Sequence, residues 1–228
     1  MESITANLIL TSLVIEAAWK KKVDYFLLFG SSTSYPPAEY PIKENEMWRS
    51  QPYEGYIGYG WMRRYLEKLA EYVYSRSEMK IAIARPSAVY GCFDNFELNT
   101  CHVLPALIRK AVQKENPYLV WGDGNDVRDF IHVTDFVKGC LLLLEKHAVC
   151  DPINIAYGTG YSIKEAVTII LKATNHINAN VQFDKTKPSK LPIRLVNTTK
   201  SKKLLNFKPL ITLEDGIIHT VKWFRENL

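Results

Sequence analysis

Apolar residues recur along the chain in two patterns. Over residues 3–22 they return at near-helical spacing, which predicts a helix. Residues 24–29 (DYFLLF) form a short, mostly apolar run that ends at Gly30, which predicts a strand buried on both faces. The same patterns predict further helices over 59–74, 103–114, 136–146, 163–173 and 213–227, and further strands over 80–84, 118–121, 130–133 and 153–156. Because strands and helices alternate, we expect an α/β fold with a parallel sheet and helices on both faces.

Local signals place two of the helix starts. Thr134 and Asp135 precede the predicted helix 136–146, as capping residues do, and Ser162 does the same for the next helix. Residues 178–209 contain more Lys, Pro and Thr than the rest of the chain. We expect them to form a long, loop-rich excursion that packs on the main body, because loops of that length often carry function.

The composition is that of a globular protein of 228 residues, with 47% hydrophobic and 23% charged residues. No apolar run approaches the roughly 18 residues that span a bilayer, so no membrane partner is expected. The net charge of +5 is small, and we interpret the lysines near 20–22 and 200–203 as solvated faces. No zinc-finger spacing, aromatic RNA-binding box or basic region with heptads is present, so no nucleic-acid partner is expected.

The cysteine pattern excludes two kinds of chemistry. The four cysteines form no C-x-x-C pair, which argues against a zinc site and against thioredoxin-like redox activity; they are Cys92, Cys101, Cys140 and Cys150. A chain of this length with so few cysteines does not need disulfides, so we expect reduced thiols, a cytoplasmic location and no metal.

Ser31 follows the predicted strand 24–29 directly, and Tyr59 and Arg63 stand one helical turn apart at the start of the predicted helix 59–74. Open parallel sheets bind their ligands at the carboxyl ends of the strands. A tyrosine beside a cation can act as an acid–base group, because positive charge favours the phenolate. On spacing alone, however, surface packing is the commoner reason for a Tyr and an Arg four positions apart.

A series of motifs extends the signal over nearly the whole chain: GSSTSYP, YGWMRRYLE, RPSAVYG, DNFELNTCHVLPALIRK, VWGDGNDVRDFIHVTD, FDKTKPSKLPIRLVNTTKSKKLLNFKP, LEDGI and VKWFREN. In this order they resemble an extended short-chain dehydrogenase/reductase of the NAD(P)-dependent epimerase/dehydratase family, in its nucleotide-sugar branch. The resemblance implies a partial Rossmann-like sheet formed by residues 1–91 and 130–155. A small C-terminal α/β portion, residues 92–129 and 156–228, would bind the nucleotide sugar.

The resemblance also implies roles for particular residues. Ser31 matches the serine that hydrogen-bonds the reacting carbonyl, and Tyr59 matches the general acid. Arg63 matches the family's lysine, which holds the cofactor ribose and favours the phenolate form of the tyrosine. His102 matches a histidine of the epimerisation step. The implied cofactor is NADP or NAD, at Gly30, Ser31, Ser32, Arg63, Ala88, Val89, Tyr90 and Gly91. The implied substrate is a nucleotide-diphospho-sugar, at Lys110, Trp121 and Arg128. Without the motifs, His102 would be a buried helix cap, Trp121 a core residue and Arg128 part of a surface ion pair.

The chain departs from the family at several of these positions. Thr33 replaces the epimerase cysteine, and its hydroxyl cannot remove a proton from a carbon atom near neutral pH. Arg63 keeps the lysine's charge in a planar guanidinium that does not give up a proton. Ala88 replaces an asparagine beside the nicotinamide, and Ser189 an aspartate of the substrate site. Together these changes weigh against epimerisation more than against reduction.

A further departure is that this sequence contains no glycine-rich turn of the kind that binds the dinucleotide pyrophosphate in this family. The chain starts at what resembles the family's fourth helix, so we expect a fragment or a truncated gene product. Gly55, Gly58 and Gly60 are a chance match to the glycine turn. The strand at 24–29 would then form an exposed apolar edge, a hazard for aggregation or strand pairing.

Two main functional hypotheses remain open. In the first, the protein reduces a 4-keto-6-deoxy nucleotide sugar with NADPH, and Tyr59 is the acid. In the second, it is a non-catalytic relative that binds a nucleotide sugar or acts as a scaffold; a third possibility is an unstable product. The resemblance also implies a homodimer formed through the helices at 3–22 and 59–74.

Overall fold

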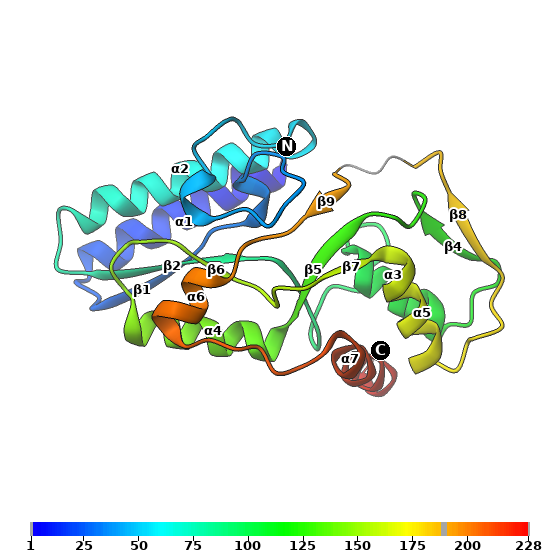
Figure 1. Cartoon of the computed structure of the whole chain (residues 1–228). Helices are drawn as coiled ribbons and strands as arrows, with labels where there is room; N and C mark the ends of the chain where they lie inside the picture. Colours follow the sequence, from blue (N-terminus) through cyan, green and yellow to red (C-terminus); the bar gives the residue numbers. More distant parts are fainter. Residues whose placement is uncertain (1, 188–190, 228) are drawn as a thin grey trace.

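The structure is a computed structural model that describes residues 2–187 and 191–227, so Ser189 lies outside the described residues. Its first sheet has the strand order β1-β2-β6, and neighbouring strands are parallel (Figure 1). These strands are β1 (Tyr25–Phe29), β2 (Lys80–Pro86) and β6 (Ile153–Ile155). The parallel order confirms the predicted α/β fold.

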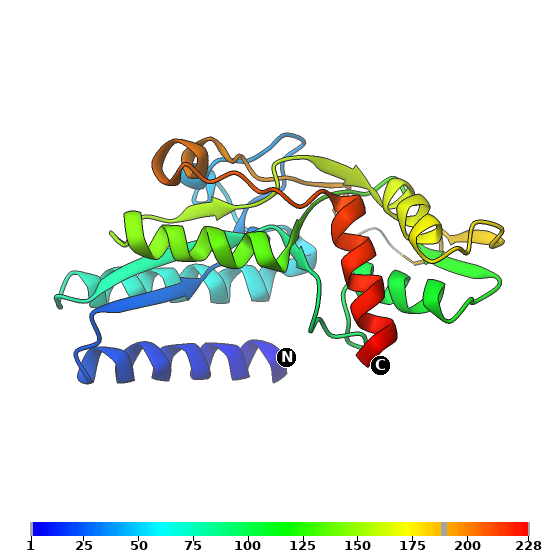
Figure 2. The same ribbon diagram turned by 90° about the horizontal axis from the view of Figure 1, so that it is seen from below.

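Helices cover both faces of this sheet. On one face lie α1 (Glu2–Lys20) and α2 (Ile57–Tyr74); on the other lies α4 (Val133–Lys146), with α6 (Thr199–Leu205) packed against it (Figures 1 and 2). The helix α2 forms because apolar residues recur three and four positions apart on its inner side, at Met62, Leu66, Ala70 and Val73. Its outer side is mostly polar or aromatic, so the helix lies on the sheet surface with one face buried.

A second group of strands continues from the first sheet. The strand β5 (Val127–His132) runs parallel to β3 (Ala88–Tyr90) and β9 (Ile193–Arg194), and antiparallel to β7 (Gly160–Ser162). Beyond it, β4 (Tyr118–Trp121) pairs in parallel with β8 (Val181–Asp184). The helices α3 (Val103–Val112), α5 (Ile163–Ala173) and α7 (Leu213–Asn227) pack together at this end of the molecule (Figure 1).

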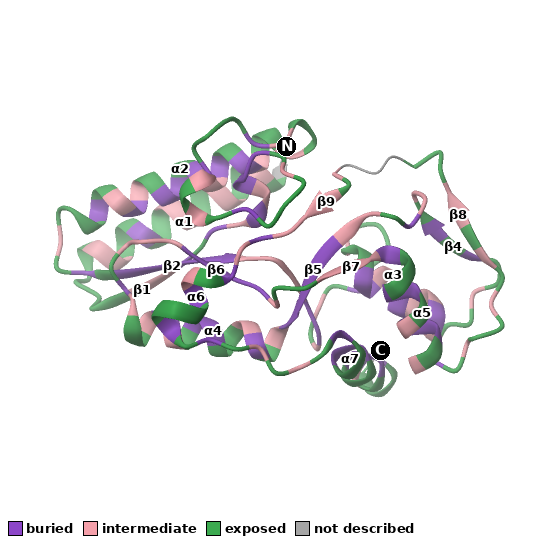
Figure 3. Ribbon diagram, in the orientation of Figure 1, coloured by how far each residue is buried: buried purple, intermediate pink, exposed green. Residues whose placement is uncertain are grey.

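The buried residues form separate clusters along the molecule (Figure 3). One cluster lies between the first sheet and α1 and α2, and includes Ile15, Leu28, Val73 and Ile81. Another lies on the opposite face under α4, and a third joins α3, α5 and α7 to β5. The assignment of portions 1–91/130–155 and 92–129/156–228 to cofactor and substrate stays a prediction.

The start of α4 corrects the predicted cap. The helix begins at Val133, so Thr134 and Asp135 lie inside its first turn, and the cap is His132, whose ring accepts from the Thr134 N–H at 3.3 Å. Asp135 instead accepts from the backbone N–H groups of Leu210 and Ile211, each at 2.8 Å. It therefore fixes the chain that leads into α7.

The cap predicted at Ser162 is confirmed. Its hydroxyl accepts from the Glu165 N–H at 3.2 Å, and the Glu165 carboxylate accepts from the Ser162 N–H at 2.7 Å. The stretch 178–209 is less irregular than expected, because it contains β8, β9 and α6. The short strands β8 and β9 pair with the distant strands β4 and β5, and a local sequence pattern cannot indicate such pairing.

Along the described chain, β1 pairs only with β2, so its other side forms an edge of the sheet. The side chain of Phe29 is 46% exposed there, and Leu10 and Val14 of α1 line a groove of about 210 Å³ beside the strand. This confirms the predicted exposed apolar edge, whereas the prediction of a strand buried on both faces was wrong, because only Leu28 of β1 is fully buried. No helix of the described residues is long and apolar enough to cross a membrane.

Candidate functional site

The candidate site begins where β1 ends, at Gly30. A Cβ atom at this position would lie 2.6 Å from a carboxylate oxygen of Glu67 and 2.9 Å from Cγ of Arg85. Only glycine therefore allows the chain to pass over this buried ion pair. The Gly30 N–H still donates to the Ala84 carbonyl at 2.8 Å, so the strand geometry is kept until the turn.

Ser31 and Thr33 follow in a tight turn that forms the 3-10 helix η1 (Ser32–Ser34). Ser31 is the N-cap of η1, and its Oγ accepts from the Thr33 N–H at 3.1 Å. The Ser31 and Thr33 hydroxyl oxygens are 2.7 Å apart and share a hydrogen bond. The Ser34 N–H donates to the Ser31 carbonyl at 3.1 Å and closes the turn. Two hydroxyls are thus held at the carboxyl end of a parallel strand.

Tyr59 and Arg63 meet on the first turns of α2. The Tyr59 hydroxyl oxygen accepts from Nε of Arg63 at 3.2 Å and from Nη2 at 2.5 Å. The third guanidinium nitrogen, Nη1, donates to the Phe29 carbonyl at 2.9 Å. Arg63 therefore ties the phenol to the end of β1, one residue before Gly30. The pair is more than surface packing, because it links two elements at the carboxyl edge of the sheet.

Arg64 and Gly60 hold η1 against α2. Arg64 is 1% exposed, and it donates from Nε to the Ser34 carbonyl and from Nη2 to the Ser50 carbonyl, each at 2.8 Å. A Cβ atom on Gly60 would lie 2.8 Å from the carbonyl oxygen of Thr33. This close approach requires glycine next to Tyr59, and it places the Ser31–Thr33 turn against the start of α2.

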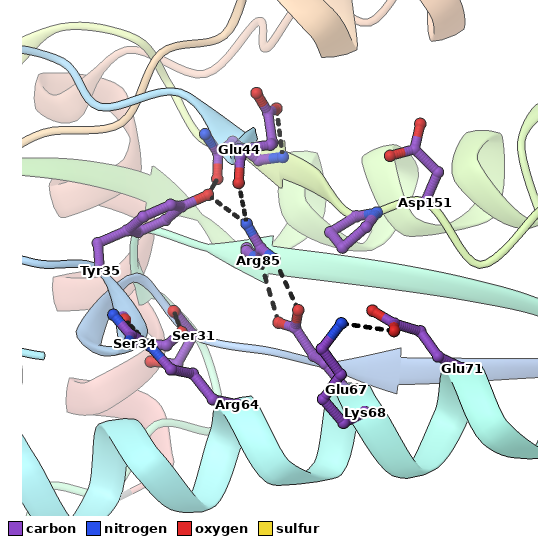
Figure 4. A network of polar contacts seen from close by, with 12 residues as sticks. Ser31, Ser34, Tyr35, Glu44, Arg64, Glu67, Lys68, Glu71, Arg85 and Asp151 are labelled. Carbon is purple, nitrogen blue, oxygen red and sulfur yellow. Dashed lines mark hydrogen bonds and ion pairs between the residues drawn. The ribbon is translucent and has the colours of Figure 1, made fainter. Parts of the chain in front are cut away.

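A buried polar network lies beneath the turn (Figure 4). Arg85 of β2 donates from Nε and Nη2 to the two carboxylate oxygens of Glu67, at 3.0 and 2.6 Å. Its Nη1 donates to the Tyr35 hydroxyl at 2.9 Å, and that hydroxyl donates to Oδ1 of Asn154 in β6 at 2.6 Å. Burial raises the pKa of Tyr35, so its phenol remains the donor. The network connects α2, β2, β6 and the chain after η1.

Two of the predicted substrate residues lie together near β4. Lys110 of α3 donates from Nζ to the Leu119 carbonyl at 3.0 Å, and Trp121 ends the strand with 69% of its surface exposed. The Lys187 ammonium lies 5.6 Å from the centre of the Trp121 ring. Trp121 is therefore an exposed aromatic surface next to a positive charge, and not a core residue.

Arg128, the third predicted substrate residue, is paired in register with Arg194 on the neighbouring strand β9. Arg128 is 8% exposed and donates to a carboxylate oxygen of Asp126 at 2.9 Å. The guanidinium of Arg194 lies 5.6 Å from the centre of the Tyr56 ring. Burial and the positive charge of Arg128 lower the pKa of Arg194. Two guanidinium groups therefore lie on neighbouring strands, and one of them, Arg128, is already paired with the Asp126 carboxylate.

Arg194 was missed from the sequence, because it lies in the stretch expected to be loop-rich. The sequence signal that could have indicated it is the segment Pro192–Arg194, in which a proline and a β-branched residue favour extended backbone directly before the arginine. A narrow pocket of about 10 Å³ connects it to the other half of the site, since Thr33, Tyr56 and Arg194 all line it. Thr33 and Arg194 therefore line one small pocket, whereas Arg128, Ser31 and Tyr59 lie outside its lining.

His102 is the exposed N-cap residue of α3, and its side chain makes no cap hydrogen bond. Burial raises the pKa of Asp94, and the hydrogen bond from the Asn95 N–H partly offsets this effect. No described contact brings His102 to Ser31 or Tyr59. Burial also raises the pKa of the Cys101 thiol next to it, which keeps this sulfur protonated.

The predicted cofactor residues lie at the carboxyl edge of the first sheet. Gly30, Ser31 and Ser32 follow β1. The strand β3, which follows β2 along the chain, consists of Ala88, Val89 and Tyr90. Gly91 comes directly after β3 and has a φ of 145°. The Tyr90 side chain is 3% exposed and packs under α7, so only its backbone faces this edge. The Ala88 and Val89 side chains pack against core clusters.

The Arg63 guanidinium and the Tyr59 phenol lie beside these residues at the end of β1, so the nicotinamide position stays a prediction. The pyrophosphate of such a cofactor needs a glycine turn that opens a helix. Gly55 lies in the 3-10 helix η3 (Glu54–Tyr56), and Gly58 and Gly60 lie inside α2, so these glycines do not form that turn. In the described chain, no group of three or more His, Cys, Asp or Glu side chains could hold a metal.

A parallel α/β sheet with a serine, a tyrosine and a cation at its carboxyl edge is the architecture of the short-chain dehydrogenase/reductase fold. The chain belongs to the NAD dependent epimerase/dehydratase family, whose model matches residues 1–156. The GDP-L-fucose synthase of Escherichia coli (strain K12) is 30% identical over 98% of this chain and 74% of its own length.

Two solved structures show the same fold. A GDP-L-fucose synthetase from Naegleria fowleri bound to NADP has a TM-score of 0.89 and 24% identity, over 97% of this chain and 69% of its own. A GDP-6-OMe-4-keto-L-xylo-heptose reductase from Campylobacter jejuni has a TM-score of 0.90 and 22% identity, over 97% of this chain and 76% of its own.

Proposed function

We propose that this protein reduces the keto group of a 4-keto-6-deoxy nucleotide sugar with NADPH or NADH, without epimerising the sugar. The observation that carries the proposal is the hydrogen-bonded Tyr59–Arg63 pair at the end of β1, beside the Ser31–Thr33 turn. Membership of the family and the similarity to sugar-nucleotide enzymes support the substrate class.

The bound dinucleotide would supply the hydride that adds to the carbonyl carbon. Ser31 donates a hydrogen bond to the carbonyl oxygen and so stabilises the negative charge that develops on it. Tyr59 transfers its hydroxyl proton to that oxygen and completes the alcohol. Arg63 stabilises the phenolate left behind, because it remains protonated and holds the phenol oxygen through two nitrogens.

The nucleotide diphosphate would bind at the other side of the shared pocket. Arg128 and Arg194 lie on adjacent strands, with Asp126 paired to Arg128, and their guanidinium groups would bind the diphosphate oxygens through paired hydrogen bonds. The exposed ring of Trp121 offers a surface on which a base or sugar can stack. The sugar then lies towards Thr33 and Ser31, which line or adjoin the same pocket.

Reduction without epimerisation follows from the groups at the site. Epimerisation needs a base that removes a proton from the carbon next to the keto group. The Thr33 hydroxyl is too weak a base near neutral pH, and the Cys101 thiol stays protonated because burial raises its pKa. His102 lies at the start of α3 with no described contact to Ser31 or Tyr59, so the proposal assigns these two residues to carbonyl reduction and gives no base to epimerisation.

The product formed in heavy water tests this proposal. We expect the full chain, given NADPH and a 4-keto-6-deoxy nucleotide sugar, to form an alcohol with no deuterium on the carbons beside the former keto carbon. Mass spectrometry and proton NMR of the purified product measure both features. Deuterium at either carbon would contradict the absence of epimerisation, and unchanged keto sugar would contradict the reductase activity.

The arginine pair gives a binding prediction. We expect Arg194→Met to weaken binding of a nucleoside diphospho-sugar by about 10- to 100-fold, as the loss of a charge-assisted contact of about 1.5–3 kcal/mol implies. Isothermal titration calorimetry measures the affinity, and Arg225→Met, at the end of α7, serves as the control for the loss of one positive charge. Equal affinities of the two variants would remove Arg194 from the site.

A non-catalytic sugar-nucleotide-binding protein is the second candidate. The observation that favours it is the position of Gly55, Gly58 and Gly60 in η3 and α2, where they do not form a pyrophosphate-binding turn. This candidate predicts the same calorimetric binding of the nucleotide sugar, but no consumption of NADPH.

A further inference from the structure

Thr33 contacts Ser31 and the start of the helix that carries Tyr59. Its hydroxyl oxygen lies 2.7 Å from that of Ser31, and its backbone N–H donates to the same Ser31 oxygen at 3.1 Å. Its carbonyl oxygen packs against Gly60 of α2, where a Cβ atom would lie only 2.8 Å away. Thr33 therefore lies between the Ser31 hydroxyl and the helix turn that carries Tyr59.

The proton count at Ser31 decides what Thr33 can do. A hydroxyl has one proton to donate and two lone pairs to accept with. One Ser31 lone pair already accepts from the Thr33 N–H. If Ser31 donated its proton to Thr33, its oxygen would face the lone pairs of a substrate carbonyl and repel them. If Thr33 donates instead, both Ser31 lone pairs are filled and its proton points away from Thr33, towards a ligand.

We propose that Thr33 is a positioning residue that donates its hydroxyl proton to Ser31 and thereby fixes Ser31 as a hydrogen-bond donor towards the substrate carbonyl. This inference rests on the proposed function, because the carbonyl is that of the keto sugar. Thr33 itself does not touch the reacting atoms and acts through Ser31.

The side chain suits this role. Threonine is branched at Cβ, which restricts its χ1 rotation and holds the hydroxyl in one direction. Arg64 fixes the following residue, because its Nε donates to the Ser34 carbonyl at 2.8 Å. The donor direction is therefore set before a substrate arrives, and this preorganisation is what makes a hydrogen bond effective in a transition state.

Kinetics of two variants test the inference. Thr33→Val keeps the shape and removes the hydroxyl, whereas Thr33→Ser keeps the hydroxyl and removes the methyl group. We expect Thr33→Val to lower kcat about tenfold while KM changes less than about twofold, because the hydrogen bond acts on the reacting carbonyl. Thr33→Ser should retain a kcat close to that of the unaltered chain.

Two kinetic results would overturn the inference. One is an unchanged kcat for Thr33→Val; the other is an equal loss in both variants, which would assign the effect to packing of the methyl group. Thermal unfolding of both variants, compared with the unaltered chain, shows whether each remains folded. If Thr33→Val does not fold, neutron diffraction from the unaltered chain still decides which hydroxyl donates the hydrogen bond.

Neutron diffraction from crystals of the deuterated full chain tests the proton arrangement without any turnover. We expect the Thr33 hydroxyl deuteron between the two oxygens, and the Ser31 deuteron directed away from Thr33. A Ser31 deuteron on the line to the Thr33 oxygen would overturn the inference. If the protein reduces no keto sugar, the proposed function fails, and the neutron map still decides the direction of this hydrogen bond.

Discussion

Tyr59→Phe should lower kcat for keto-sugar reduction by about 10²- to 10⁴-fold, because it removes the proton donor of the proposed site. The aromatic ring remains, so the packing at the start of α2 should be preserved. Arg63 still donates to the Phe29 carbonyl, and the proposed diphosphate residues Arg128 and Arg194 are unaltered. We therefore expect little change in KM. Steady-state rates of NADPH consumption measure both constants.

Tyr65→Phe is the matched control for this experiment. Tyr65 lies on the same helix and is 54% exposed, so removing its hydroxyl should leave both kinetic constants unchanged. If Tyr59→Phe and Tyr65→Phe turn over at equal rates, Tyr59 is not the acid and the proposed chemistry is wrong.

Glu67→Ala should destabilise the fold by about 3–5 kcal/mol, because it leaves the Arg85 guanidinium buried without its counter-charge. The side chains of the two partners are only 1–2% exposed, and two hydrogen bonds of 3.0 and 2.6 Å join them. Denaturant unfolding followed by circular dichroism measures the free energy of unfolding.

Glu71→Ala is the control, since Glu71 stands one turn further along α2 and pairs with Lys68 at 2.6 Å (Figure 4). Its side chain is 43% exposed, so we expect a loss below about 1 kcal/mol. The double variant Glu67→Ala/Arg85→Met removes both charges, and it should be more stable than Glu67→Ala alone. Equal losses for Glu67→Ala and Glu71→Ala would show that the buried network adds nothing.

The buried network also explains how the site keeps its shape. Glu67 lies on the same helix as the proposed catalytic residues, two turns after Tyr59 and one turn after Arg63. Through Arg85 and Tyr35 it is connected to β2, to β6 and to the chain that leaves η1. Gly30 passes directly over the pair, so the Ser31 turn is built on it. A change in this pair should therefore disturb the geometry of the candidate site as well as the stability.

The long periodic elements could be predicted from the sequence. The helices at 163–173 and 213–227 and the strand at 118–121 have the expected bounds, since amphipathic spacing, a capping box and a compact apolar run are local signals. The strands β3, β7 and β9 were missed, because two or three residues are too short to show a period. They exist through pairing with β5, which is a tertiary interaction.

The same distinction applies to the site. Tyr59 and Arg63 are four positions apart on one helix, so the sequence could bring them together, and the structure adds their contact with the end of β1. Arg194 reaches Arg128 only because β9 pairs with β5, and no local pattern indicates that pairing. The hydrogen bond between the Thr33 and Ser31 hydroxyls depends on the tight η1 turn, which the residue types alone do not specify. The catalytic and binding roles of all these residues stay predictions.

The most direct test of the central claim is the near-ultraviolet absorbance of NADPH when the full chain is mixed with a 4-keto-6-deoxy nucleotide sugar. The account predicts that the absorbance falls as the keto sugar is reduced, and that the rate is proportional to protein concentration. A folded protein that binds the nucleotide sugar by calorimetry but leaves the NADPH absorbance constant would contradict the claim. The chain would then be a binding protein, in which Ser31, Tyr59 and Arg63 no longer perform chemistry.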